Sequence, residues 1–192
     1  MTELPDWRAR RWAATHQRIY DAALALFLEH GFDGVNVGQI ARGAGVSVPT
    51  FYAHYPSKEH IVMQLPTAEE VAAIIAEVPA DLPFTERLRR GPVQFLAAWT
   101  PEFRAAQLVR WRVIAGTPSL RTQAAAFERR TAGFIVDALP LTPGTPLRPA
   151  EAVVVNAYMS AYTSALLAWA DGNGERKLEE LVDEAFDALQ QH

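Results

Sequence analysis

Cysteine is absent from the 192-residue chain. Its absence excludes disulfide bonds and thiolate metal sites, and it fits a reducing compartment. The first residues, MTELPDWRARRW, lack the apolar core of a signal peptide, so we expect a cytoplasmic protein. The five histidines follow no metal-binding spacing, and the segment GQIARGAG has neither the strand nor the lysine of a phosphate-binding loop. The sequence therefore predicts no metal, no cofactor and no enzymatic activity.

An excess of positive charge is also missing. The chain has 18 Lys and Arg against 22 Asp and Glu, a net charge of −4. Residues 1–60 carry six basic and six acidic side chains, so the negative excess lies in residues 61–192. Nonspecific coating of nucleic acid is disfavoured, because such binding depends on many phosphate contacts. Selective binding by a few well-placed basic groups stays open.

One long apolar run stands out. Residues 152–170, AVVVNAYMSAYTSALLAWA, form 19 residues without a charge, close to the length that spans a bilayer. Asn156, Ser160, Thr163 and Ser164 lower its hydropathy, and no basic flank follows it. We interpret the run as a helix buried in a helical assembly rather than as a membrane span.

Residues 36–61, NVGQIARGAGVSVPTFYAHYPSKEHI, carry the signals of two short helices joined by a tight turn. Asn36 is a suitable cap for the first helix, and Gly45 can take the positive φ that ends it. Ser47 is the next cap, and Pro49 stands in the first turn of the second helix, where its missing N–H breaks no intrahelical bond. This order predicts a helix-turn-helix motif, which places its second helix in a DNA major groove.

A longer segment around this motif resembles a known family. Residues 18–61 are similar to the N-terminal DNA-binding domain of TetR/AcrR transcriptional regulators. The resemblance rests on AALALF in the first helix, Gly31-Phe32, Ile40-Ala41, Ala44-Gly45-Val46-Ser47, Thr50, Tyr52, Tyr55 and Ser57-Lys58-Glu59. It implies an all-α protein with a three-helix DNA-binding domain in residues 1–60 and a helical effector-binding and dimerisation domain in residues 61–192.

The resemblance also implies which residues meet DNA. Val48, Pro49 and Thr50 are expected at base edges, where their methyl and methylene groups suit thymine methyl groups. Other positions correspond to phosphate contacts or caps in the family. The predicted DNA-binding set is Asn36, Arg42, Ser47, Val48, Pro49, Thr50, Tyr52, His54 and Lys58. Residues 1–14, with the cluster Arg8, Arg10 and Arg11, form either a frayed helix or an arm. They are either a solvated tail or a contact to phosphates or the minor groove of DNA.

Beyond the motif, proline and glycine divide the chain into helical segments. We expect a first helix at residues 15–30, a helix opened by Ser57 that stops before Pro66, and further helices at 68–78, 85–99, 101–115, 118–139, 149–170 and 175–190. Thr67 with Glu70 forms a capping-box pattern. Gly91-Pro92 is expected to weaken or split one helix, and residues 140–149 form a linker.

The last two predicted helices each carry a stripe that suits a helical partner. The small residues Ala157, Ala161, Ser164 and Ala168 share one face, and Leu178, Leu181, Val182, Ala185 and Leu189 share a face of the final helix. Two such helices from each of two chains form a four-helix bundle, the dimer joint implied by the resemblance. The alternative is that both stripes pack within one chain.

Aromatic and polar residues gather in the C-terminal part. Aromatics at helical spacing are ordinary core in most proteins, whereas the resemblance implies a cavity for a small, mostly apolar effector. The predicted effector-binding set is Phe95, Trp99, Phe103, Gln107, Arg110, Trp111, Phe127, Asn156, Tyr158 and Tyr162. Both interpretations stay open at this point.

Together these features predict a homodimeric transcriptional regulator, a repressor released from a palindromic DNA operator by a small lipophilic effector. One alternative is a DNA-binding protein without a ligand. The other is a helical enzyme or carrier of small molecules in which the helix-turn-helix is vestigial.

Overall fold

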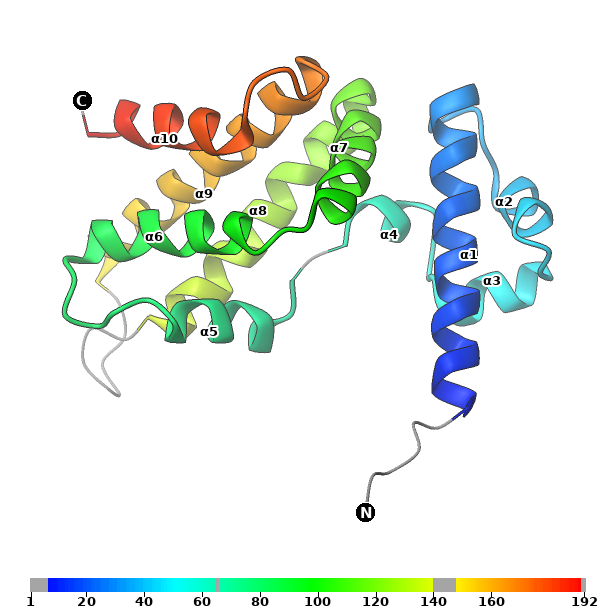
Figure 1. The fold of residues 1–192 in the computed structure, drawn as a ribbon, viewed down its shortest axis with the longest axis horizontal. Helices are drawn as coiled ribbons and strands as arrows, with labels where there is room; N and C mark the ends of the chain where they lie inside the picture. The colour runs from blue at the N-terminus through cyan, green and yellow to red at the C-terminus, as the bar shows by residue number, and fades with distance from the viewer. Residues whose placement is uncertain (1–6, 65, 140–147, 191–192) are drawn as a thin grey trace. The chain divides into compact units, whose positions relative to one another are not determined.

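A computed structural model describes residues 7–64, 66–139 and 148–190. Within these residues the chain forms ten α-helices and no strand, which confirms the predicted all-α class (Figure 1). The chain divides into two compact units, residues 1–64 and 65–192. The predicted division at residue 60 falls inside α4 (Glu59–Val62), which packs against α1 (Trp7–His30) and so lies in the first unit.

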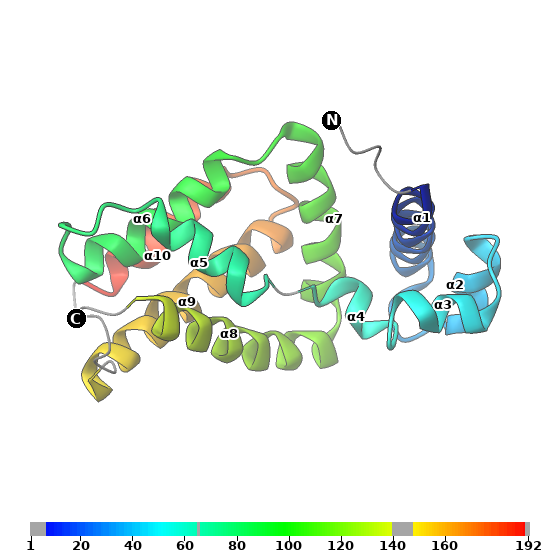
Figure 2. The same ribbon diagram turned by 90° about the horizontal axis from the view of Figure 1, so that it is seen from below.

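The N-terminal unit is built on α1. The helices α2 (Val37–Gly43) and α3 (Val48–His54) follow it, and α2 packs on both α1 and α3 (Figure 2). Its fully buried side chains include Ile19, Ile40 and Phe51, one from each helix. Gly43 lies against α1, where a Cβ built on it would be in ordinary contact with the Cβ of Ala22 at 3.6 Å.

The turns of the N-terminal unit follow the predicted signals. Asn36 caps α2 and accepts from the Gln39 backbone, while the Gln39 side chain accepts from the Asn36 N–H at 2.8 Å. Gly45, with φ of 64°, takes the left-handed conformation that turns the chain between α2 and α3. Ser47 then caps α3, as predicted. Local side-chain chemistry therefore sets the start of both short helices.

Two predicted helix boundaries in this unit are wrong. α1 begins at Trp7, not at Thr15, because Trp12 and His16 continue its packed face and stack on each other with ring centroids 4.8 Å apart. Ser57 does not cap α4, since its hydroxyl bonds to the imidazole Nδ1 of His60 at 3.0 Å. α4 is only four residues long and ends before Pro66.

The C-terminal unit is organised around one helix. It contains α5 (Ala68–Ala76), α6 (Phe84–Ala97), α7 (Pro101–Gly116), α8 (Pro118–Ala138), α9 (Pro149–Asp171) and α10 (Leu178–Ala188). α9 packs on α6, α7, α8 and α10, and it contributes Val155, Tyr158, Leu166 and Trp169 to the core (Figure 1). Most of the predicted linker at 140–149 lies outside the described residues.

The structure shows what becomes of the Gly91-Pro92 pair and of the long apolar run in this unit. α6 runs unbroken through Gly91 and Pro92, so the expected split is wrong. Gly91 is buried, and a Cβ built there would lie in ordinary contact with Ile74 at 3.9 Å. α9 is the one helix within the described residues whose length and composition would allow a membrane span. Its buried face fits instead the predicted core helix.

Candidate nucleic-acid interface

α3 exposes a face that is free of charge. Val48 and Tyr52 are 41% and 53% exposed, and Pro49 and Ala53 are also exposed, whereas Phe51 is fully buried and fixes the helix to the unit. The four exposed residues share one arc of the helix, because helical positions i, i+1, i+4 and i+5 lie within about 140° of each other. We call Val48, Pro49, Tyr52 and Ala53 the apolar face of α3.

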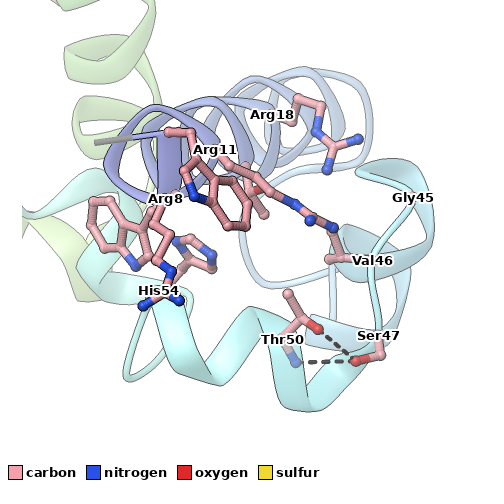
Figure 3. Close-up of a pocket in the computed structure, with 11 residues that line it drawn as sticks. Arg8, Arg11, Arg18, Gly45, Val46, Ser47, Thr50 and His54 are labelled. Atoms are coloured by element: carbon pink, nitrogen blue, oxygen red, sulfur yellow. Dashed lines mark hydrogen bonds between the residues drawn. The ribbon is translucent and has the colours of Figure 1, made fainter. Parts of the chain in front are cut away.

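The hydroxyl groups at the start of α3 are paired with each other. Ser47 Oγ accepts from the Thr50 backbone N–H at 3.1 Å and lies 2.8 Å from Thr50 Oγ1 (Figure 3). Both side chains face the same side of α3 as His54. α3 therefore has a polar side next to α1 and an apolar face turned away from it.

An open cleft of about 620 Å³ lies between the N-terminal half of α1 and the start of α3. Arg8, Arg11 and Arg18 enter it from α1, opposite Ser47 and Thr50 (Figure 3). Within the described part of the chain, Arg11 and Arg18 form no ion pair with a carboxylate. The cleft thus presents cationic groups beside the exposed helix, an arrangement that suits phosphate oxygens.

Aromatic rings tie the first turns of α1 to the end of α3. Trp12 lies 4.9 Å from His54, and His16 lies 4.2 Å from Tyr55, both measured between ring centroids. The Tyr55 hydroxyl donates to the His16 carbonyl at 3.4 Å. Burial, with a smaller contribution from His54, lowers the pKa of His16, so its neutral form is favoured. This stack keeps the arginines of α1 next to α3.

The predicted phosphate contact of Lys58 does not fit the structure. Its ammonium donates to the backbone carbonyls of Phe32 and Val35, each at 2.8 Å, and lies 4.3 Å from the Phe32 ring centroid. Two of its three N–H groups are therefore used inside the unit. Lys58 fixes the loop between α1 and α2, and we remove it from the proposed DNA-contacting set.

The other predicted residues occupy different positions around α3. Asn36 is a helix cap, and Arg42 is exposed in the last turn of α2. His54 is half-buried, with its Nδ1 atom enclosed and without a hydrogen-bond partner among the described residues. Its position against Trp12 makes it part of the stack rather than an outward-facing group.

Arg18 was not selected from the sequence, and Arg8 and Arg11 were considered only as part of residues 1–14, whose contact with DNA was left open. Arg8, Arg11, Thr15 and Arg18 follow the i, i+3, i+7, i+10 spacing of one helical stripe. That stripe is visible only if the helix is extended back to Trp7, and the predicted start at Thr15 concealed it.

The arrangement of α2, a glycine turn and an exposed α3 braced by α1 defines a helix-turn-helix DNA-binding domain. Residues 19–65 match the family described as "Bacterial regulatory proteins, tetR family". Residues 19–65 are therefore similar to the DNA-binding domain of the TetR family of transcriptional regulators.

Curated relatives share this part of the sequence. An HTH-type transcriptional regulator of Mycobacterium bovis is 41% identical over 69 residues, which is 36% of this chain and 36% of that protein. A mycofactocin biosynthesis transcriptional regulator of Mycobacterium tuberculosis is 44% identical over 52 residues, 27% of this chain and 26% of the relative. The chain therefore matches about a third or less of the length of these relatives.

Solved structures are similar over nearly the whole fold. A TetR-family regulator of Streptomyces coelicolor superposes with a TM-score of 0.54 at 22% identity, covering 93% of this chain and 81% of that one. A TetR-family regulator of Mesorhizobium loti superposes with a TM-score of 0.51 at 22% identity, covering 94% of this chain and 97% of that one. At this identity the likeness concerns the fold of both units.

The predicted effector-binding residues do not all lie together. Tyr158 is core, packed on Phe186 with ring centroids 5.0 Å apart, while Phe95 and Phe103 are 37% and 44% exposed. Asn156 is exposed and donates to the carbonyl of Ala152. Trp99, Gln107, Arg110, Trp111, Phe127 and Tyr162 are buried or half-buried. Phe95 and Phe103 stay in the proposed effector set, because their ring centroids lie 5.7 and 5.3 Å from that of Trp99. The core residue Tyr158 and the exposed Asn156 are left out of it.

The predicted dimer residues also divide into two groups. Leu178 and Val182 are fully buried and Ala161 is 9% exposed, because α9 and α10 pack on each other within one chain. These three side chains cannot also meet a partner without unfolding the core. Ala157, Ser164, Ala168, Leu181, Ala185 and Leu189 remain exposed or half-buried.

Proposed function

We propose that the chain is a homodimeric transcriptional repressor that binds a palindromic DNA operator and is released by a small, mostly apolar effector. The observation that carries the DNA-binding part is the exposed α3 beside a cleft that holds Arg8, Arg11 and Arg18. α3 has the size and exposure to enter a major groove, and the arginines are placed to meet the flanking phosphates.

The proposed dimer uses the exposed part of α9 with α10. Val153 is 68% exposed, and Ala157, Ser160, Ser164 and Ala168 extend this uncharged face along α9. The Ser164 hydroxyl donates to the Ser160 carbonyl at 2.8 Å, so its polar group is satisfied without water. Small side chains allow a second helix to approach closely. To meet successive major grooves, the two α3 helices of such a dimer must lie about 34–36 Å apart.

The proposed effector site is a half-buried polar and aromatic cluster at α6, α7 and α9. Arg110 donates to the buried Gln107 at 3.0 Å, and Arg104 lies 5.7 Å from the Trp99 ring centroid. Burial raises the pKa of the Tyr162 hydroxyl, which Arg110 and Glu179 influence electrostatically. The Trp99 indole N–H has no hydrogen-bond partner in the described part of the chain. An apolar effector with one polar end would suit these groups.

DNA selection from a random duplex pool with the full-length protein tests the first part. Replacing Arg11 and Arg18 by Gln should weaken binding and reduce the slope of log affinity against log salt by about one for each lost phosphate contact. Arg176→Gln is the matched control, because Arg176 pairs with Glu184 in the C-terminal unit. An unchanged salt slope in the double variant would remove the arginine cleft from the proposal.

Sedimentation and thermal shift test the other two parts. Ala168→Glu should convert the dimer to a monomer, because it places a charge on the uncharged face of α9. A panel of lipophilic compounds should contain one that raises the melting temperature. That compound should lower the affinity of the protein for DNA roughly 5- to 150-fold, and bound DNA should lower the affinity for the compound by the same factor. Equal compound affinity with and without DNA would exclude effector-driven release.

A further inference from the structure

The apolar face of α3 indicates what kind of base it reads. Among residues 47–54, no side chain is Arg, Lys, Asn, Gln, Asp or Glu, the types that form paired hydrogen bonds with base edges. The exposed residues offer the methyl groups of Val48 and Ala53, the ring of Pro49 and the phenol of Tyr52. If α3 enters a groove as proposed above, its main contacts with bases are apolar.

Three side chains near this face, Ser47, Thr50 and His54, contact other residues, whereas the phenol of Tyr52 is exposed and can bond to DNA. The Ser47 and Thr50 hydroxyls bond to each other at 2.8 Å, and Ser47 also accepts the Thr50 N–H. His54 packs against Trp12 on the cleft side of the helix. Turning the Ser47 oxygen away from the Thr50 N–H would cost the cap of α3, which is worth about fivefold in helix stability. Hydrogen-bond readout by Ser47, Thr50 and His54 is therefore disfavoured.

We infer that α3 selects its operator through the C5 methyl groups of thymine. Thymine is the one unmodified base that presents an apolar group in the major groove, and the other three bases present only hydrogen-bonding groups there. Guanine or adenine placed opposite Val48 and Pro49 would leave its acceptors desolvated and unpaired. The specificity-determining residues are Val48, Pro49 and Ala53, and the arginine cleft supplies affinity without sequence preference. This inference rests on the proposed DNA binding.

Replacing thymine by uracil isolates the inferred contact, because it removes one methyl group and keeps the hydrogen-bonding pattern of the base pair. The duplex selected by the full-length protein is made again with uracil at each thymine of the half-site in turn. Uracil at a position facing α3 should weaken binding about fourfold for each methyl group lost. The same change in both half-sites should weaken it roughly tenfold or more. Placing 5-methylcytosine there should bind better than cytosine.

A double-mutant cycle assigns the methyl contact to a residue. Val48→Ala should weaken binding of the thymine duplex roughly fourfold and leave the affinity for the uracil duplex within about twofold. Leu28→Ala is the matched control, because this leucine is 48% exposed on α1 outside α3 and the cleft. It should leave both affinities unchanged.

The possible results separate the inference from the proposed function. Tight binding of the selected DNA with no loss on uracil substitution overturns methyl readout and leaves the DNA-binding function standing. Selection of guanine at the positions where Val48→Ala changes the affinity would also overturn methyl readout and leave the DNA-binding function standing. Failure to select any DNA overturns the proposed function, and the inference with it.

Discussion

The two units of the chain hold their helices in place by different means. In the N-terminal unit, short helices begin at side-chain caps and turns, and Lys58 fixes a loop through two backbone carbonyls. In the C-terminal unit, long helices surround α9, and their buried faces form one apolar cluster. The family match lies in residues 19–65. Both units use helix caps, but the N-terminal unit adds a polar lysine contact across 23 to 26 residues, whereas apolar packing around α9 holds the C-terminal unit.

The largest expected effects come from opening the core of one unit at a time. Phe51 and Phe186 are both fully buried, one in α3 and one in α10. Phe51→Ala and Phe186→Ala should each cost about 3–5 kcal/mol in the unit that carries the change. Denaturation of the full chain, followed by helical circular dichroism, should show an early partial transition in each variant. A single transition shifted equally in both would mean that the units unfold together.

A smaller loss is expected from Lys58→Met. The change keeps much of the side-chain volume but leaves the carbonyls of Phe32 and Val35 without their charged donor. We expect a loss of about 2–3 kcal/mol, confined to the N-terminal unit. Lys177→Met is the control, because Lys177 is exposed and its nearest carboxylate oxygen, on Glu180, is 3.9 Å away. Similar urea midpoints for the two variants would show that the Lys58 bonds contribute little.

Two helix caps allow a direct comparison of the units. Ser47 caps α3, and Thr100 caps α7 by accepting from the Phe103 N–H at 3.2 Å. Ser47→Ala and Thr100→Ala should each cost about 1 kcal/mol. In α3 the cap supports only seven residues, so hydrogen exchange should rise throughout that helix, whereas in α7 it should rise in the first turn alone. A rise in hydrogen exchange that extends equally far along α3 and α7 would contradict this difference between the two caps.

The smallest expected effect is a pH dependence of the N-terminal unit. Burial lowers the pKa of His16 below its ordinary value of 6.5, so the unfolded chain binds this proton more readily than the folded chain. The contribution of His16 to stability is therefore complete above about pH 6.5 and is lost as the pH falls towards the folded-state pKa. Urea midpoints between pH 5 and 8 should decline less in His16→Gln than in the unsubstituted protein.

His30→Gln serves as the control for this titration, because His30 is exposed at the end of α1. It should keep the pH dependence of the unsubstituted protein. Parallel curves for the His16→Gln variant and the unsubstituted protein would show that the His16 stack contributes no proton linkage.

The sequence predicted most of the fold because its helix ends carry local signals. Asn36, Ser47, Thr67 and Thr100 all cap the helices that they were expected to cap, and Gly45 has the predicted positive φ. These signals act over three or four residues and need no tertiary structure. Helices α7 and α8 begin where predicted, each with proline in its first turn, although only α7 has a side-chain cap bond and Thr117 makes none to α8.

The candidate site was less accessible from the sequence. The roles of Lys58, Trp12 and His16 depend on residues far away in the chain, such as the Phe32 carbonyl and the Tyr55 ring. The same applies to Leu178 and Val182, whose burial between helices of one chain cannot be separated from a dimer contact by periodicity alone. Apolar stripes show that a partner exists, not whether it belongs to the same chain.

The division of α3 into an apolar face and a side next to the arginine cleft has a consequence for how such a protein acquires new targets. Exchanging Val48, Pro49 or Ala53 alters surface side chains whose loss leaves the buried Phe51 in place. The cationic groups on α1 are untouched by these exchanges. With the proposed mode of DNA binding, a redesigned or duplicated copy would change its target sequence by single substitutions while the phosphate contacts of α1 are kept.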